Sequence, residues 1–157
     1  MVSLLLRNLL FTILQPGLVA GLLPYLLLGN KQEILWPAEW MIINYVAAAL
    51  FISGLIILLN CIYRFAKEGR GTLSPVDPTK KLFVTGLYRF SRNPMYIGVM
   101  LILVAEAVFL QRGSLWIYLT VVFFLFNLFI ALHEEPRLRR VFGDDYAKYC
   151  GKVRRWL

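Results

Sequence analysis

The chain has 157 residues, of which 59% are apolar and 17% are charged. Soluble domains are usually about 45–50% apolar and about 25% charged, so this composition argues against a soluble globule, and also against a disordered chain. The net charge of +8 comes without a nucleic-acid-binding motif, so we expect no nucleic-acid partner. The two cysteines, Cys61 and Cys150, match no metal-binding or disulfide spacing.

Four continuous apolar runs occupy residues 4–28, 40–63, 95–110 and 114–132. Continuous runs indicate helices, whereas a membrane barrel would show short segments of alternating polarity. Pro16 and Pro24 interrupt the first run, where we expect a kinked helix. The third run has 16 residues and, at ~1.5 Å per residue, falls short of the ~30 Å hydrocarbon core. We expect it to extend through Pro94 or to cross a locally thinned bilayer.

We therefore predict an all-α integral membrane protein with four transmembrane helices in a single domain, residues 1–157. Residues 1–65 hold two N-terminal spans, and residues 66–157 hold the last two spans, a loop and an amphipathic helical tail. Seven basic residues lie in 64–93 and seven in 133–157, whereas the other two interhelical segments hold only Lys31 and Arg112. The positive-inside rule places the basic segments and both termini in the cytoplasm. We expect the plasma (inner) membrane of a prokaryote.

The segment 64–93 carries the start of the third helix. Its glycines and prolines exclude one continuous helix, and its apolar second half is expected to pack on the membrane face or on the tail. Asn93 followed by Pro94 is typical of a helix start, with Asn as the cap. The amide groups of that first turn either serve only the cap or bind an anion.

Two adjacent acids, Glu134 and Glu135, stand before Pro136, which is expected to end the fourth span. Two carboxylates gain nothing from the negative end of a helix. They are either a solvated pair neutralised by the arginines that follow, or a site that recognises hydroxyl groups or a cation. His133 is the only histidine, so we expect no metal site.

The tail has apolar residues at spacings of three and four: Leu138, Phe142, Tyr146, Tyr149, Val153 and Trp156. This spacing predicts an amphipathic helix, which Gly143 and Gly151 are expected to break into shorter pieces. A basic amphipathic segment is either an anchor on an anionic membrane surface or a cover that closes over a bound ligand.

Several motifs in this order resemble a known family. They are GRGT at 69–72, GLYRFSRNPMYIG at 86–98, EEPRL at 134–138, FGDDYAKY at 142–149 and KVRRW at 152–156. Together they resemble the integral-membrane methyltransferases that include isoprenylcysteine carboxyl methyltransferases and phospholipid N-methyltransferases. The resemblance implies that residues 66–157 are a methyltransferase core, with S-adenosylmethionine held between the last two spans and the tail.

The resemblance also implies which residues contact the cofactor. Glu134 and Glu135 match the family's paired acids, and Asn93 matches its RHP or RNP contact. The other matched positions are Gly69, Gly71, Tyr96, Gly98, Lys152 and Arg154, and we expect Tyr146 and Tyr149 to help cover the adenine. We expect Arg92 to orient an anionic acceptor and Glu135 to be the base for an amine acceptor. Asn93 stands where the carboxyl-methylating branch usually has His, and this difference weakens the prediction of a carboxyl methyltransferase.

The expected function is methyl transfer from S-adenosylmethionine to a lipophilic acceptor, a lipid amine or carboxylate, at the cytoplasmic membrane face. The expected partners are this acceptor and membrane lipid. Three alternatives remain. A small four-span transporter would need an intramembrane carboxylate, for which Glu106 is poorly placed. An NADPH-dependent membrane reductase lacks a glycine-rich dinucleotide motif here, and the third alternative is a non-catalytic scaffold.

Overall fold

The computed structural model describes residues 16–28, 42–68, 82 and 84–157. These residues form helices joined by short connections, with no strand among them, so the all-α prediction is confirmed for this part of the chain. In chain order the elements are the π-helix η1 (Leu18–Leu22), α2 (Leu23–Leu28), α3 (Ile42–Glu68), the 3-10 helix η2 (Gly86–Arg89), α4 (Pro94–Leu110), α5 (Gly113–Phe129), the π-helix η3 (Ile130–Glu134) and α6 (Glu135–Lys152).

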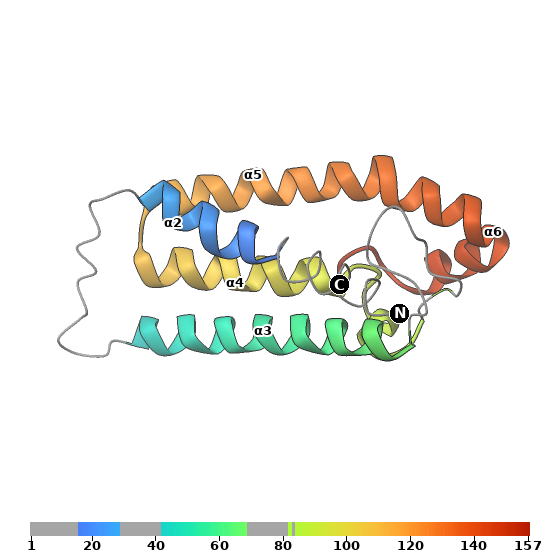
Figure 1. Cartoon of the computed structure of the whole chain (residues 1–157), viewed down its shortest axis with the longest axis horizontal. Coiled ribbons are helices and arrows are strands. Elements are labelled where there is room, and N and C mark those ends of the chain that lie inside the picture. Colours follow the sequence, from blue (N-terminus) through green and yellow to red (C-terminus); the bar gives the residue numbers. More distant parts are fainter. Residues whose placement is uncertain (1–15, 29–41, 69–81, 83) are drawn as a thin grey trace, which may run out of the picture.

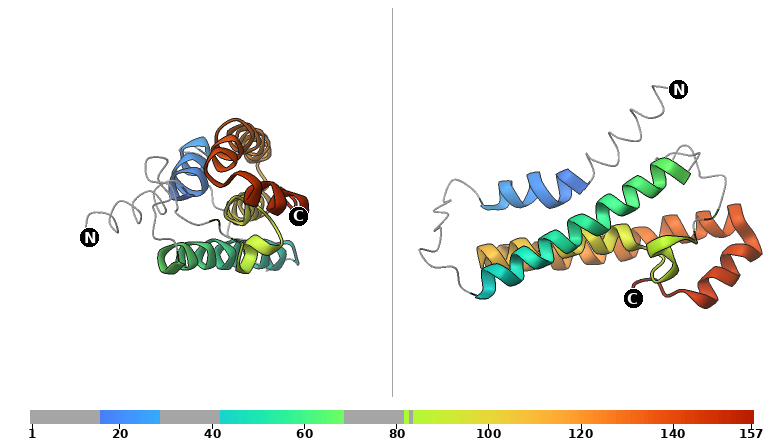
Figure 2. Two further views of the ribbon diagram at one scale, coloured as in Figure 1. Left: turned by 90° about the vertical axis from the view of Figure 1, so that its right-hand side faces the viewer. Right: turned by 90° about the horizontal axis from the view of Figure 1, so that it is seen from below.

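The long helices α3, α4 and α5 lie side by side, and each runs antiparallel to the helix before it (Figure 1). Helix α2 covers one end of this bundle and packs against α5, while η1 contacts α4. The short connection between α4 and α5 lies at that same end. Helix α6, η2 and the C-terminus gather toward the opposite end, which the right-hand view in Figure 2 also shows. The described residues just before α4 and the tail therefore meet at one end of the bundle.

Two helical segments are long and apolar enough to cross a membrane, Ile42–Arg64 with 23 residues and Gly113–Lys152 with 40, the second of which bends at Gly143. The core helix of a soluble protein is mostly buried, but only 22% and 17% of their most apolar stretches are buried within the protein. Large side chains such as Ile42, Ile56, Ile117 and Phe124 lie exposed along them. These outward apolar faces fit contact with lipid rather than with water.

Two shorter apolar helices accompany these segments, Leu18–Leu27 and Pro94–Leu110. Helix α4 begins at Pro94 as expected and has 17 residues, which at ~1.5 Å per residue give about 26 Å, still below the ~30 Å hydrocarbon core. The structure thus confirms apolar helices in the places expected and shows two of full spanning length.

Helices α3 and α4 cross closely because each presents a glycine. A Cβ atom added at Gly54 would lie 2.7 Å from the carbonyl oxygen of Gly98, and one added at Gly98 would lie 3.0 Å from the carbonyl oxygen of Gly54. The adjoining core contains five buried residues, Leu58, Val99, Ile102, Leu103 and Val122. Small residues at such a crossing let two backbones approach within a membrane. The pair Gly54 and Gly98 therefore fixes the position of α4.

We expected Pro136 to end the helix of the fourth span, and this expectation was wrong. The chain stays helical from α5 through η3 into α6. Proline has no N–H and clashes with a helical carbonyl in the preceding turn. Here that turn is a π-helix, in which the N–H of Glu135 donates to the carbonyl of Ile130, five residues earlier. The wider turn places Pro136 in the first turn of α6, where a missing N–H costs little.

We predict that Gly54→Val destabilises the protein by about 1–3 kcal/mol, the usual cost of overpacking, because the new side chain meets the backbone of α4. Thermal unfolding in detergent micelles measures the effect. Gly113→Ala is the matched control, since a Cβ there meets nothing within 4 Å. Equal unfolding midpoints for Gly54→Val and wild type would contradict the crossing.

Candidate functional site

The tail folds back onto the bundle because α6 bends at Gly143. This residue has φ 49° and ψ −122° inside α6, a conformation open to glycine, and the helix turns there toward the start of α4 (Figure 1). The predicted break at Gly143 is confirmed. Gly151 lies in the last turn, because α6 ends at Lys152 and Val153 is extended. The predicted helical stripe therefore stops before Trp156, and residues 153–157 form a non-helical C-terminal strap.

The aromatic residues of the tail are buried inside the protein. Tyr146 and Tyr149 are only 2% and 6% exposed and lie with Val153 in one cluster. The cluster is completed by Leu82, Leu138, Phe142 and Cys150. The hydroxyl of Tyr149 donates a 2.6 Å hydrogen bond to the carbonyl of Tyr88. The tail thus packs against the loop before α4, and these side chains are not left to face lipid as a simple anchor would require.

Asn93 precedes α4 as predicted, but its side chain does not cap the helix. Its Nδ2 instead donates to the carbonyl of Arg155 at 2.9 Å. The hydroxyl of Ser91 donates to the same carbonyl at 3.2 Å and accepts the N–H of Asn93 at 3.1 Å. The N–H of Arg92 donates to the carbonyl of Arg154 at 3.0 Å. The turn before α4 therefore holds the backbone of the strap.

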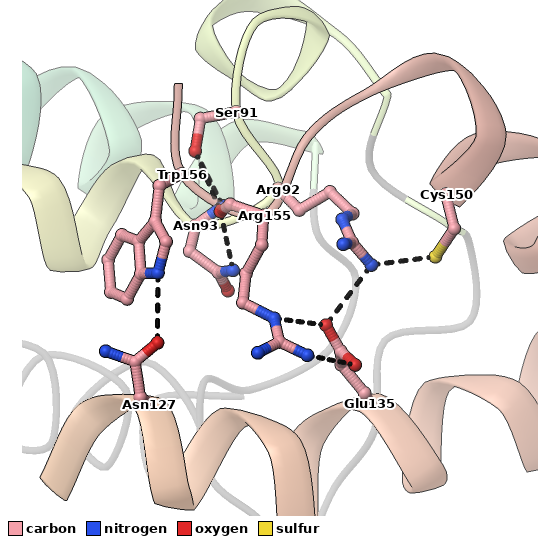
Figure 3. Close-up of polar contacts among 8 residues, drawn as sticks. All are labelled: Ser91, Arg92, Asn93, Asn127, Glu135, Cys150, Arg155 and Trp156. Carbon is pink, nitrogen blue, oxygen red and sulfur yellow. Dashed lines mark hydrogen bonds and ion pairs between the residues drawn. The ribbon is translucent and has the colours of Figure 1, made fainter. Parts of the chain in front are cut away.

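Trp156 attaches the strap to α5. Its Nε1 donates to Oδ1 of Asn127 at 3.0 Å, and its ring lies 5.4 Å from that of Phe123. Figure 3 shows the hydrogen bond between Trp156 and Asn127 beside the Asn93 contact, so the strap joins α5 to the turn before α4.

Glu135 lies at the centre of this junction, between two guanidinium groups (Figure 3). Arg155 donates from Nε to Oε1 and from NH2 to Oε2, both at 2.9 Å. NH1 of Arg92 lies 3.2 Å from Oε1, and the Glu135 side chain is only 13% exposed. Both carboxylate oxygens are therefore engaged by charge-assisted hydrogen bonds.

Arg92 also contacts Cys150, with NH1 at 2.9 Å from Sγ. Burial lowers the pKa of the Arg92 guanidinium, but electrostatic interactions with Cys150 and Glu135 oppose this and raise the pKa overall, so Arg92 stays a cation. Its side chain is 15% exposed, and its buried Nε has no hydrogen-bond partner among the residues that the structure describes. Arg92 thus keeps one donor for a further acceptor group.

Glu134 makes a different contact from its neighbour. The hydroxyl of Tyr96 donates to its Oε1 at 2.6 Å, and the Tyr96 ring packs edge-on against Phe126 with centroids 4.7 Å apart. Within the described part of the chain, the second oxygen of Glu134 makes no hydrogen bond. The two adjacent acids therefore differ, because Glu135 is saturated by guanidiniums and Glu134 keeps an open oxygen.

The structure brings together some of the residues that the sequence singled out. Arg92, Asn93, Glu135, Tyr146 and Tyr149 meet at the junction, and Tyr96 and Glu134 lie beside it. Lys152 and Arg154 have exposed side chains. Gly98 faces α3 at the Gly54 crossing. Gly69 and Gly71 lie outside the described residues. No three His, Cys, Asp or Glu side chains gather as a metal site in the described segments.

Sequence reasoning missed Ser91, Asn127, Cys150 and Arg155 as parts of the junction, and it placed Trp156 only on the helical stripe of the tail. The helical pattern placed Arg155 off the apolar face of the tail. That pattern does not apply after Val153, where the chain is extended and its side chains change direction. The available signal was Gly151 near the end of the tail, which favoured a helix end before the last residues.

Comparisons with known proteins find a family and several relatives for this chain. A family model described as phospholipid methyltransferase matches residues 42–145. An uncharacterised protein of Haemophilus influenzae is 38% identical over 63 residues, which are 40% of this chain and all of the relative. A probable protein-S-isoprenylcysteine O-methyltransferase of rice, Oryza sativa, is 26% identical over 125 residues, which are 78% of this chain and 65% of the relative.

A further relative is the delta(14)-sterol reductase of chicken, Gallus gallus. It is 27% identical over 157 aligned residues, which cover 86% of this chain but only 22% of the reductase. No solved structure matches the chain. The relatives of known name are therefore longer than this chain.

Proposed function

Because the chain belongs to the phospholipid methyltransferase family, we propose that it transfers a methyl group from S-adenosylmethionine to a lipophilic acceptor, a lipid amine or carboxylate. The observation that carries the proposal is the junction at one end of the bundle. There the start of α4, the acids of η3 and α6, and the strap converge next to exposed apolar helices. A lipophilic acceptor can reach such a junction from the bilayer.

The residues present fit this methyl donor, which combines a ribose diol and an ammonium group with a carboxylate. The open oxygen of Glu134 can accept hydrogen bonds from the diol or from the ammonium group. The start of α4 has no side-chain cap, so its first-turn amides can receive the donor carboxylate. Tyr96 would hold Glu134 in place. Leu138 and Phe142, the partly buried members of the aromatic cluster, can supply an apolar wall for the adenine, whereas Tyr146 and Tyr149 are buried beside them within the protein.

When bound, the donor supplies a methyl group on a sulfonium, which is open to direct displacement. The work of the protein is then to align the acceptor and to exclude water. Arg92, with its unpartnered Nε, orients an anionic group of the acceptor. A carboxylate acceptor needs no base. For an amine acceptor, the open oxygen of Glu134 is better placed to take the proton than Glu135, whose two oxygens are held by guanidiniums.

A second candidate is a membrane reductase, because the match to the chicken sterol reductase covers 86% of this chain. The two functions differ in the nucleotide they bind. Titration of the purified protein in detergent with S-adenosylhomocysteine, and separately with NADPH, distinguishes them. Saturable binding of S-adenosylhomocysteine alone supports the methyltransferase, and binding of NADPH alone supports the reductase.

We also propose that four helices cross the membrane, with both termini and the junction on the cytoplasmic side. The antiparallel order of the described helices places the start of α4 and the tail at one end of the bundle, and Arg112 at the other (Figure 1). In the described part of the chain, the basic residues other than Arg112 lie in 64–68, 84–93 and 137–155, a bias that the positive-inside rule associates with the cytoplasmic side.

The topology predicts that a cysteine introduced at Arg112, in a chain in which Cys61 and Cys150 are replaced by serine, is labelled only from the non-cytoplasmic side. Membrane-impermeant maleimide applied to intact cells and to inside-out vesicles measures the side. A cysteine introduced at Arg139 should show the reverse. Labelling of residue 112 only in the inside-out vesicles would refute the proposed orientation.

We predict that Glu134→Gln weakens binding of S-adenosylhomocysteine about tenfold or more, the effect of losing a charge-assisted hydrogen bond. The protein should remain folded, because the change removes no buried volume. Isothermal titration in detergent measures the affinity. Asp145→Asn, which removes a charge at an exposed position of α6, is the control and should bind normally. Wild-type affinity of Glu134→Gln would remove Glu134 from the site.

A further inference from the structure

Arg155 is held in two independent ways, by its backbone and by its side chain. Its carbonyl accepts hydrogen bonds from Ser91 and Asn93, and its guanidinium makes the two-point contact with Glu135. A change of the Arg155 side chain therefore leaves the backbone contacts of the strap in place. The effect of the guanidinium can be measured separately from the attachment of the strap.

The three charged groups at the junction do not balance. One carboxylate, Glu135, lies between two cations, Arg92 and Arg155, which leaves one positive charge in excess within this trio. Arg155 takes up both carboxylate oxygens at 2.9 Å. Arg92 has a single, longer contact of 3.2 Å with the same carboxylate. The buried Nε of Arg92 has no partner in the described part of the chain.

We propose that Arg155 is a positioning residue that keeps Arg92 available to an anionic group of the methyl acceptor; this inference rests on the proposed function. Without the Arg155 guanidinium, Oε2 of Glu135 has no partner. The carboxylate then closes on Arg92 as a two-point fork, the favoured geometry of an arginine–carboxylate pair, and occupies the Nε donor. Arg155 prevents this by binding both oxygens of Glu135 first.

The proposal predicts that a substitution of Glu135 reverses the effect of a substitution of Arg155. Arg155→Gln should lower the reactivity of Arg92 toward phenylglyoxal, measured by peptide mass spectrometry without donor or acceptor. It should also raise the apparent KM for a polar lipid extract about tenfold, the effect of one lost charge-assisted contact. Affinity for S-adenosylhomocysteine should stay within about twofold, since Glu134 and Tyr96 are untouched. Adding Glu135→Gln to Arg155→Gln should restore both Arg92 reactivity and KM, because the competing carboxylate is gone.

Two further variants serve as controls. Arg139→Gln removes the same charge from an exposed position of α6 and should behave as wild type. Arg155→Lys keeps the charge but not the two-point geometry, and should fall between wild type and Arg155→Gln in Arg92 reactivity. Thermal unfolding of each variant in detergent verifies that the comparison is made between folded proteins.

Unchanged Arg92 reactivity in Arg155→Gln would overturn the proposal, and so would a double variant that is no better than Arg155→Gln. A double variant that is no better is expected if Arg155 has only a structural role, because the loss of both contacts would then weaken the junction further. If the wild type binds no S-adenosylhomocysteine and methylates nothing in the extract, the proposed function fails, and the phenylglyoxal arm still decides whether Arg155 controls Arg92. If the wild type methylates lipid and Arg155→Gln does so with unchanged KM, only the role of Arg155 fails.

Discussion

The carboxylate of Glu135, held between the guanidiniums of Arg92 and Arg155, is the interaction that the junction depends on. It joins three parts of the chain that are far apart in sequence: the turn before α4, the first turn of α6 and the C-terminal strap. A partly buried ion pair that loses one partner leaves an uncompensated charge, which is strongly destabilising. The three groups therefore constrain one another at the junction.

Helix geometry brings Glu135 to this point. Because the π-helical turn η3 lies just before Pro136, the helix continues through this proline. Such turns are frequent at functional sites. The adjacent acids then point to different partners, Glu134 to Tyr96 and Glu135 to the arginines. The bend at Gly143 returns the tail to the start of α4. The close crossing of Gly54 and Gly98 sets α4 against α3 and thereby fixes where that start lies.

Much of this fold could be predicted from the sequence, because the helical secondary structure, the start of α4 and the bend at Gly143 depend on local patterns. The continuation of the helix past Pro136 could not, since it depends on a change of helical register that no composition signals. The different roles of Glu134 and Glu135 could not be separated either, because they are set by partners 38 and 20 residues away, Tyr96 and Arg155. Arg155 was missed because the helical pattern was carried past Val153, where the chain is extended.

We propose that the first turn of α4, Glu134 of η3 and the tail of α6 hold the methyl donor. Amide hydrogen exchange of the full chain in detergent, with and without S-adenosylhomocysteine, tests it most directly. The account predicts slower exchange in residues 91–98 and 134–156 when the ligand is added, and unchanged exchange in Ile42–Arg64. Exchange that stays the same throughout the chain, or protection confined to the end where α4 and α5 connect, would contradict the account.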